Sequence, residues 1–298
     1  NDYYSNSTGH FVVANTILGQ ASIANTTYEI DFKIKDVESV VVSALGDPPS
    51  ISTSADVSDP GKYYRNNVVG SLNLIECCQQ AGIGLFVFSS SAAVYGNPEK
   101  VPVDEDAATR PINPYGRTKL ITEWTLDDFA RRSGPNRALR YVALRYFNVA
   151  GARLDGTLGQ ATPEATHLIK VACEAACGKR DSVSIFGTDY DTRDGSCIRD
   201  YVHVSDLADA HLRALDYLKR ENQDLIVNLG TSKGLSVLEI MQIAREVSGA
   251  EFKYTLGPRR AGDPAVVLAK SDLAAELLGW QAKHSNAKTL METSLRAY

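Results

Sequence analysis

The stretch from Leu85 to Lys119 constrains the fold of this chain more than any other. It begins with LFVF, an unbroken apolar run typical of a buried parallel strand, and this strand ends in the serines Ser89, Ser90 and Ser91. After a loop rich in Pro and Asp, ordered structure returns at PINPYGRTK, which predicts the start of a helix. The stretch therefore predicts a serine-tipped strand followed by a helix, as in α/β folds with a parallel sheet.

Tyr115 and Lys119 lie four residues apart and share one face of the expected helix. An ammonium close to a phenol favours the phenolate and lowers its pKa from about 10 toward the physiological range, so the tyrosine becomes a usable base. A serine hydroxyl at the strand end can share the same substrate oxygen. Tyr-x-x-x-Lys also arises by chance in amphipathic helices, and it is the serine-tipped strand upstream that favours a catalytic role.

Further blocks along the chain extend this pattern. They are YYRNNVVGSLNL, FVFSSSAAVYG, PINPYGRTK, LRYFNVAGA, GKRDSVSIFGTDYDTRDGSCIRDYVHVSDLADAH, NLGTSKGLSVLEI and GPRRAGDPAV. In this order they resemble the extended short-chain dehydrogenase/reductase family, and within it the epimerases that interconvert UDP-glucose and UDP-galactose. The resemblance runs from Tyr63 to the C-terminus. It implies an α/β fold with a doubly wound, parallel, Rossmann-like sheet that binds NAD, and a smaller α/β domain that binds the UDP-sugar.

The resemblance also implies how the chain is divided. The NAD-binding domain would consist of residues 1–150 together with about 200–235. The UDP-sugar-binding domain would consist of about 151–199 and 236–298. The chain begins with Asn1 rather than Met, and no G-x-x-G-x-x-G or G-x-G-x-x-G turn follows an apolar strand. We therefore expect a nucleotide domain truncated at its N-terminus, without the glycine-rich turn that normally cradles the pyrophosphate. VESVVVSAL is expected to form a buried parallel strand.

The family's catalytic residues correspond to Ser91, Tyr115 and Lys119. The positions that the family uses for NAD are Asp2, which would receive the adenosine ribose, and Asn66, Ser89, Tyr115, Lys119 and Tyr146. For Asn66, the alternative is a polar cluster at the N-terminus of a helix.

The family's substrate contacts correspond to Ser91, Asn148, His167, Leu168, Phe186, Arg199, Arg260 and Asp263. Phe186 can stack on a uracil ring, and arginine suits a diphosphate because its guanidinium is a planar bidentate donor. A lone histidine such as His167 is more often structural than functional. For Arg199, the alternative is a surface ion pair with Asp200.

The activity implied by the resemblance passes through a 4-keto sugar. Ser90 and Ala92 flank Ser91 where sugar-nucleotide dehydratases carry Asp-Glu, so dehydration is disfavoured. Val267 falls where the family controls the size of the sugar pocket, so UDP-GlcNAc and UDP-GalNAc stay open as substrates, as do UDP-pentoses. The alternative from another class is a truncated product that binds UDP-sugars without catalysis.

Composition sets the remaining expectations. The formal net charge is −5, which disfavours nucleic acid or an anionic membrane as the partner, and no apolar run approaches the length that spans a bilayer. The five cysteines lack paired C-x-x-C spacing, so we expect no metal site and a reducing, cytoplasmic location. The family habit implies a homodimer.

Overall fold

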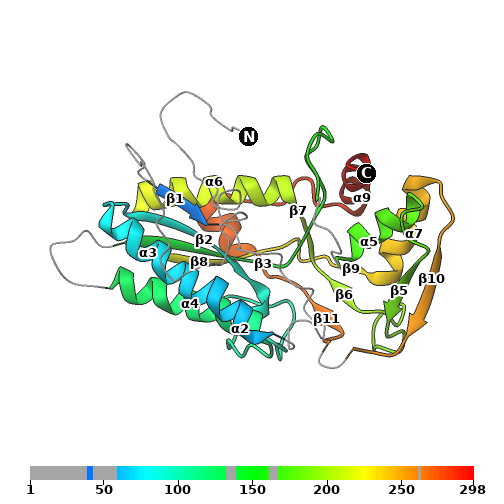
Figure 1. Cartoon of the computed structure of the whole chain (residues 1–298), viewed down its shortest axis with the longest axis horizontal. Coiled ribbons are helices and arrows are strands. Elements are labelled where there is room, and N and C mark those ends of the chain that lie inside the picture. The colour runs from blue at the N-terminus through cyan, green and yellow to red at the C-terminus, as the bar shows by residue number, and fades with distance from the viewer. Residues whose placement is uncertain (1–38, 43–58, 132–138, 161–166, 261–262) are drawn as a thin grey trace.

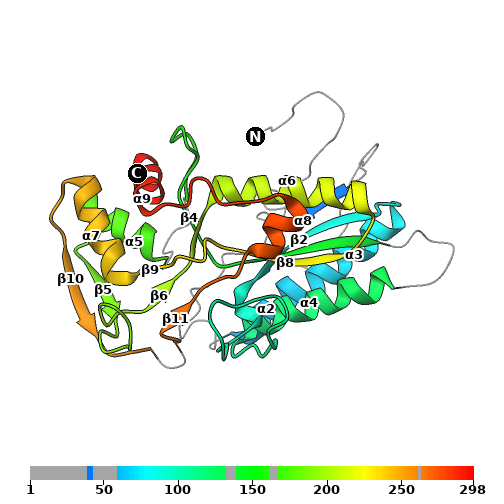
Figure 2. The same ribbon diagram turned by 180° about the vertical axis from the view of Figure 1, so that it is seen from behind.

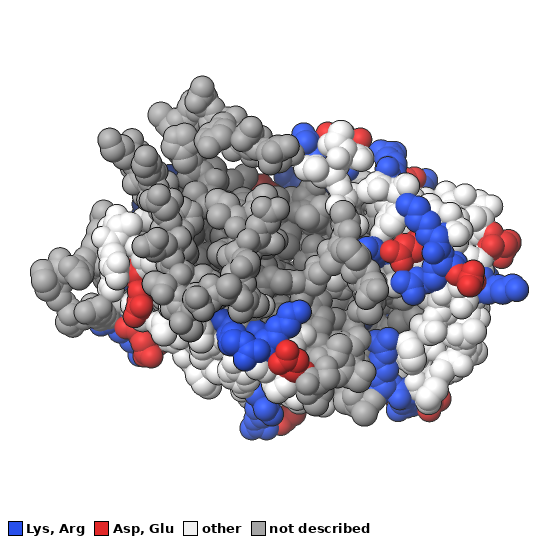
Figure 3. Space-filling model, viewed as in Figure 1, with Lys and Arg blue, Asp and Glu red and all other residues white. Residues whose placement is uncertain are grey.

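The computed structural model describes residues 39–42, 59–131, 139–160, 167–260 and 263–298, with backbone alone for 39–42. Asp2 lies outside these residues. Among the described helices, none combines the length and apolar character needed to cross a membrane. On the face in Figure 3, Lys and Arg side chains are interspersed with Asp and Glu over the described surface.

A parallel four-stranded sheet forms the larger part of the molecule (Figure 1). Its strands, in spatial order, are β1 (Ser39–Val42), β2 (Leu85–Ser91), β3 (Arg140–Tyr146) and β8 (Leu225–Leu229). The predicted parallel strands at VESVVVSAL and LFVF are confirmed by the β1–β2 pairing. Each strand carries apolar residues at successive positions because both faces of the sheet are covered.

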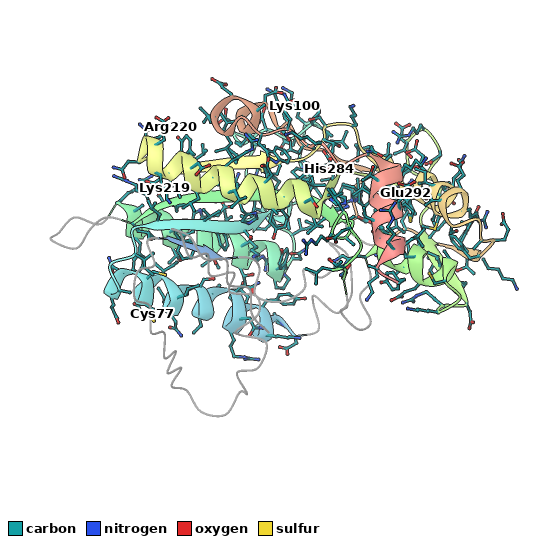
Figure 4. All side chains as sticks on the ribbon, turned by 90° about the horizontal axis from the view of Figure 1, so that it is seen from above. Cys77, Lys100, Lys219, Arg220, His284 and Glu292 are labelled. Atoms are coloured by element: carbon teal, nitrogen blue, oxygen red, sulfur yellow. The ribbon has the colours of Figure 1, made fainter. Side chains whose placement is uncertain are left out.

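Helices pack on both faces of this sheet (Figures 1 and 2). One face carries α2 (Pro60–Tyr63), the π-helix η2 (Tyr64–Val69), α3 (Gly70–Gln80) and α4 (Pro114–Ala130). The opposite face carries α6 (Val204–Glu221), and α8 (Asp272–Leu278) packs against α6 and β8. Figure 4 shows α6 lying across the strands, with Lys219 and Arg220 at one end and His284 near the other. The sheet is therefore doubly wound, as the sequence predicts.

Alternating residues of β2 and β3 supply two separate apolar cores. Phe86 and Phe88 pack with Leu126 on the α4 side. Val87 and Leu144 pack with α6 on the other side. The same alternation continues into the polar ends of these strands, so neighbouring residues there face different helices.

Short strands and three helices make the smaller part of the molecule, on the right in Figure 1. The strands are β4 (Asn148–Ala150) with β7 (Tyr201–His203), β5 (Ser182–Phe186) with β10 (Lys253–Gly257), and β6 (Ile198–Arg199) between β9 (Leu235–Ser236) and β11 (Val266–Val267). The helices α5 (Leu168–Ala176), α7 (Val237–Ser248) and α9 (Ala287–Arg296) pack in one apolar core. The expected domain boundaries stay a prediction; within the C-terminal segment, α8 packs on the larger sheet.

Candidate active site

Ser91 is the last residue of β2, where the strand turns into a short 3₁₀ helix, η3 (Ala92–Val94). The Ser91 hydroxyl oxygen accepts a hydrogen bond of 3.2 Å from the Ala93 amide, so it caps this helix. Among the described residues, no hydrogen bond uses the proton of this hydroxyl, which can therefore be offered to a ligand. A capped turn at the carboxyl end of a parallel strand holds the serine where α/β sheets bind ligands.

The first turn of α4 lies directly against η3. Asn113 caps the helix through a 2.8 Å hydrogen bond from the Gly116 amide, and Pro114 takes the first helical position. A Cβ atom at Gly116 would lie only 2.4 Å from the Ala93 carbonyl oxygen. Glycine is therefore required for this close approach, which brings Tyr115 beside the end of β2.

Lys119 is buried one turn beyond Tyr115. Its side chain is 2% exposed, and its Nζ lies 5.7 Å from the centroid of the Tyr115 ring. Nζ donates a 2.8 Å hydrogen bond to the Ser89 carbonyl oxygen. Burial lowers the pKa of Lys119 to about 7, and the Glu123 carboxylate opposes this shift. The geometry thus brings together the serine-tipped strand, the tyrosine and the lysine predicted from sequence.

Ser89 and His211 meet on the α6 side of the strand ends. The Ser89 hydroxyl lies 2.9 Å from His211 Nε2, and Tyr146, the register partner of Ser91, is buried. His211 belongs to α6 and was not predicted from sequence.

A charged network fills the α4 side of the same strand ends. Arg145 donates two hydrogen bonds to Glu123, of 3.0 and 2.6 Å, and the two side chains are 6% and 2% exposed. Ser90 donates to the same carboxylate, and Arg145 also donates to the Tyr95 hydroxyl at 3.0 Å. The Tyr95 hydroxyl in turn donates to the Asn228 side chain on β8. The network therefore connects α4 to the strands β2, β3 and β8.

Asn66 and Asn67 have different surroundings. Asn66 is exposed on η2, whereas Asn67 is buried and its amide donates a 3.0 Å hydrogen bond to Thr118 of α4. The Thr118 hydroxyl donates to the Tyr115 carbonyl oxygen at 2.8 Å. Asn67 therefore braces the helix that carries Tyr115, whereas Asn66 is exposed at the surface of the described part.

A second group of predicted residues gathers in the smaller part of the molecule. Arg199 on β6 forms an ion pair with Asp263, and both side chains are 9% exposed. The Arg260 guanidinium lies 4.0 Å from the centroid of the Phe186 ring. The Asp263 amide donates to the Arg260 carbonyl oxygen at 3.3 Å, so the two pairs adjoin.

The alternative interpretation of Arg199, a surface ion pair with Asp200, is wrong. Asp200 is fully buried, and its carboxylate accepts hydrogen bonds from the backbone amides of Thr231, Ser232 and Ala269. Consecutive residues of an extended segment face opposite sides, so Arg199 and Asp200 take different partners.

Asn148 connects the two groups along the chain. It begins β4, two residues after Tyr146, and it pairs in register with Tyr201 of β7. Tyr201 is buried and lies two residues after Arg199. Tyr201 is a further candidate that sequence reasoning missed.

His167 and Leu168 lie at the start of α5. His167 is the residue before the helix, and its Nδ1 lies 2.8 Å from the Gln160 side chain. Leu168 packs against the core of the smaller part. Both are half-buried.

The residues around Tyr115 fit the nicotinamide ribose end of a dinucleotide. A lysine ammonium has three donors, and for Lys119 the described residues supply one acceptor, the Ser89 carbonyl. Ribose hydroxyls are suitable acceptors for the others, beside a phenol and a serine. Within the described part, no group of three or more His, Cys, Asp or Glu side chains could hold a metal ion.

The functional candidates that sequence reasoning missed are Glu123, Arg145, Tyr201 and His211. Weak signals were present: Glu123 falls one helical turn after Lys119, and Arg145 interrupts the apolar strand YVALRYF. A charged residue inside a buried segment indicates a partner, although the sequence does not say which.

Comparisons with known proteins agree with this geometry. Residues 20–230 match the model of the NAD dependent epimerase/dehydratase family. A UDP-glucose 4-epimerase of Azospirillum brasilense is 53% identical over 246 residues, which are 83% of this chain and 70% of the relative.

Two solved structures show the same fold. A UDP-glucose 4-epimerase of Brucella ovis in complex with NAD has a TM-score of 0.81 at 45% identity, covering 87% of this chain and 77% of its own. A UDP-Glc/GlcNAc 4-epimerase of Campylobacter jejuni has a TM-score of 0.72 at 46% identity, covering 87% and 76%. The chain therefore belongs to the NAD dependent epimerase/dehydratase family.

Proposed function

We propose that this chain interconverts UDP-glucose and UDP-galactose through a 4-keto sugar, with NAD as its cofactor. The observation that carries the proposal is the buried set of Ser91, Tyr115 and Lys119, with Lys119 Nζ 5.7 Å from the Tyr115 ring centroid. The epimerase relatives support the substrate assignment.

The proton chemistry falls to the side chains of this chain. Tyr115, as phenolate, takes the proton from the sugar C4 hydroxyl and later returns it. Ser91 donates a hydrogen bond to the same oxygen, using the proton that its capping role leaves available. A cationic Lys119, whose Nζ lies 5.7 Å from the centroid of the Tyr115 ring, stabilises the phenolate. NAD, when bound, accepts the C4 hydride and gives it back to the opposite face of the ketone.

Five residues are proposed to hold NAD. Lys119 would donate to the nicotinamide ribose, Tyr146 and Ser89 would lie against the nicotinamide, and exposed Asn66 would reach the cofactor from η2. Asp2, outside the described residues, is proposed for the adenosine ribose.

The residues of the smaller part are proposed to anchor the UDP group. Phe186 would stack on uracil, Arg199 and Arg260 would bind the diphosphate, and Asp263 would accept from the ribose hydroxyls. Asn148, His167 and Leu168 would lie along the diphosphate. Firm anchoring at UDP with few contacts to the sugar leaves the ketose free to turn over between the two hydride transfers.

We further propose a cytoplasmic homodimer. Three large apolar side chains are exposed on η2, α3 and α4, namely Val69, Leu72 and Trp124, the last 59% exposed. Exposed apolar groups on neighbouring helices favour self-association. Cys77, labelled in Figure 4, lies on the same helix as Leu72, and all five cysteines are free. Light scattering of Trp124→Glu against the unchanged chain tests the interface, with a shift to monomer expected.

The test of the reaction uses the purified chain with UDP-galactose. Formation of UDP-glucose, followed by NMR, is expected, together with near-stoichiometric NAD released on heat denaturation. UDP binding without conversion would contradict the proposal and support a UDP-sugar-binding product without catalysis.

A wider substrate range is a second candidate. Val267 on β11 pairs in register with Arg199, and it packs in one cluster with Phe147, the residue before Asn148. This small side chain therefore borders both the residues around Tyr115 and those around Arg199. The dual specificity in the name of the Campylobacter jejuni structure supports this candidate. The same assay with UDP-GlcNAc is expected to give UDP-GalNAc.

A further inference from the structure

We propose that His211 is a positioning residue that orients the Ser89 hydroxyl through a directed chain of hydrogen bonds. The inference rests on the proposed function, in which Ser89 lies against the nicotinamide. His211 belongs to α6, on the side of the sheet opposite α4, and it reaches the end of β2 from that side.

The direction of the chain follows from the second nitrogen of the imidazole. His211 Nδ1 lies 2.8 Å from the Leu207 carbonyl oxygen, which can only accept, so Nδ1 carries the proton. In the neutral ring Nε2 is then an acceptor, and the Ser89 hydroxyl at 2.9 Å must donate to it. One backbone carbonyl therefore fixes the direction of the hydrogen bond between His211 and Ser89.

The surroundings keep this imidazole neutral. Burial lowers the pKa of His211, and the hydrogen bond to Leu207 acts in the opposite direction. Ala210 and Ala214, its neighbours on the buried side of α6, are fully buried in the apolar core.

Ser89 joins this chain to the catalytic lysine. Its carbonyl oxygen accepts from Lys119 Nζ at 2.8 Å, while its hydroxyl donates to His211 at 2.9 Å. Side chains from α4 and α6 thus fix one residue at the end of β2 from both sides of the sheet. Loss of the His211 acceptor would free the Ser89 hydroxyl to rotate away from its defined position.

A packing role alone would give a different result. If His211 only satisfied buried polar groups, its loss would lower the unfolding midpoint without changing the turnover of the folded enzyme. A positioning role lowers kcat and leaves KM for the UDP-sugar unchanged, because UDP is proposed to bind in the other part of the molecule.

The first experiment reads the tautomer without relying on activity. In protein labelled with ¹⁵N-histidine, the spectrum of His211→Gln identifies the His211 signals among the five histidines. We expect the neutral Nδ1–H tautomer near neutral pH, with a shifted Nε2 signal in Ser89→Ala. An Nε2–H tautomer, an imidazolium, or an Nε2 signal that Ser89→Ala leaves in place would overturn the directed chain.

The second experiment separates positioning from stability. His211→Leu removes the acceptor and is expected to lower kcat about tenfold with KM unchanged, and His211→Gln, whose amide oxygen can accept from Ser89, should restore most of the loss. The matched control is Leu215→Ala, a buried α6 residue one turn further on, which should lower the unfolding midpoint but not kcat.

The outcomes distinguish the two proposals. If the unchanged chain is active and His211→Leu has the same kcat, the positioning role is overturned and the proposed function stands. An inactive unchanged chain would contradict the proposed function, while the tautomer measurement would still decide the hydrogen-bond chain.

Discussion

The two faces of the sheet hold the same strand ends in different ways. On the α4 face, Ser90 and Arg145 meet the carboxylate of Glu123, so the contact is between buried charges. On the α6 face, Ser89 meets a neutral imidazole. Ser90 and Arg145 are register partners in the β2–β3 ladder, and Ser89 is the residue before Ser90 on β2.

This difference indicates how each face of the sheet responds to substitutions. A buried ion pair has large opposing desolvation and attraction terms, so removal of one partner leaves an uncompensated charge. A neutral hydrogen-bond chain involves smaller energies but fixes direction. We therefore expect substitutions on the α4 face to change mainly the free energy of unfolding. Substitutions on the α6 face should change mainly the geometry of the strand ends.

The largest expected effect is on the α4 face. Glu123→Gln should lower the free energy of unfolding by about 3–5 kcal/mol, because Arg145 is left as a buried unpaired charge. Denaturant unfolding measures the change. The control is Asp127→Asn, which breaks the exposed Arg131–Asp127 pair on the same helix and should cost less than about 1 kcal/mol.

A double variant sharpens this prediction. Glu123→Leu with Arg145→Met removes both charges and should recover most of the stability lost in Glu123→Gln, since apolar replacement of a buried pair is often neutral. A double variant as unstable as the single one would show that charge pairing is not what governs this face.

The matched change on the α6 face should be smaller. Ser89→Ala leaves the buried His211 acceptor without its donor, at a cost of about 1–3 kcal/mol in unfolding free energy. Calorimetry on Ser89→Ala and Glu123→Gln side by side tests the ranking. If the serine variant were the less stable of the two, the contrast between the faces would fail.

The last expected effect is a pH slope at Lys119, which belongs to α4. Its pKa falls from 10.5 to about 7 in the folded chain because of burial. Between these values the unfolded chain holds a proton that the folded chain has lost, so this group makes stability rise with pH. Lys119→Met lacks the slope, and its stability relative to the unchanged chain should fall as pH rises above about 7.

Thermal midpoints recorded across that range test the slope. A difference between variant and unchanged chain that stays constant with pH would mean that Glu123, rather than burial, dominates the charge state of Lys119.

The local parts of this site could be predicted from the sequence. Tyr115 and Lys119 share a helix face because four residues make about one turn, and the structure confirms α4 at Pro114–Ala130. Ser91 at the end of an apolar strand follows from the same kind of local pattern.

The partners across the fold could not be predicted. Glu123 with Arg145, and Ser89 with His211, are joined only when β2, β3, α4 and α6 pack together. Alternation along a strand predicts that neighbours face opposite sides, but it does not say which helix covers each side. The wrong alternative of Arg199 with Asp200 has the same origin, since adjacent residues looked like partners.

The central claim is that Tyr115 is the acid–base group of a 4-epimerase, and Tyr115→Phe tests it most directly. Conversion of UDP-galactose to UDP-glucose should fall by about 10²–10⁴-fold, with UDP affinity and unfolding midpoint unchanged. A Tyr115→Phe variant that keeps most of the turnover of the unchanged chain would contradict the account.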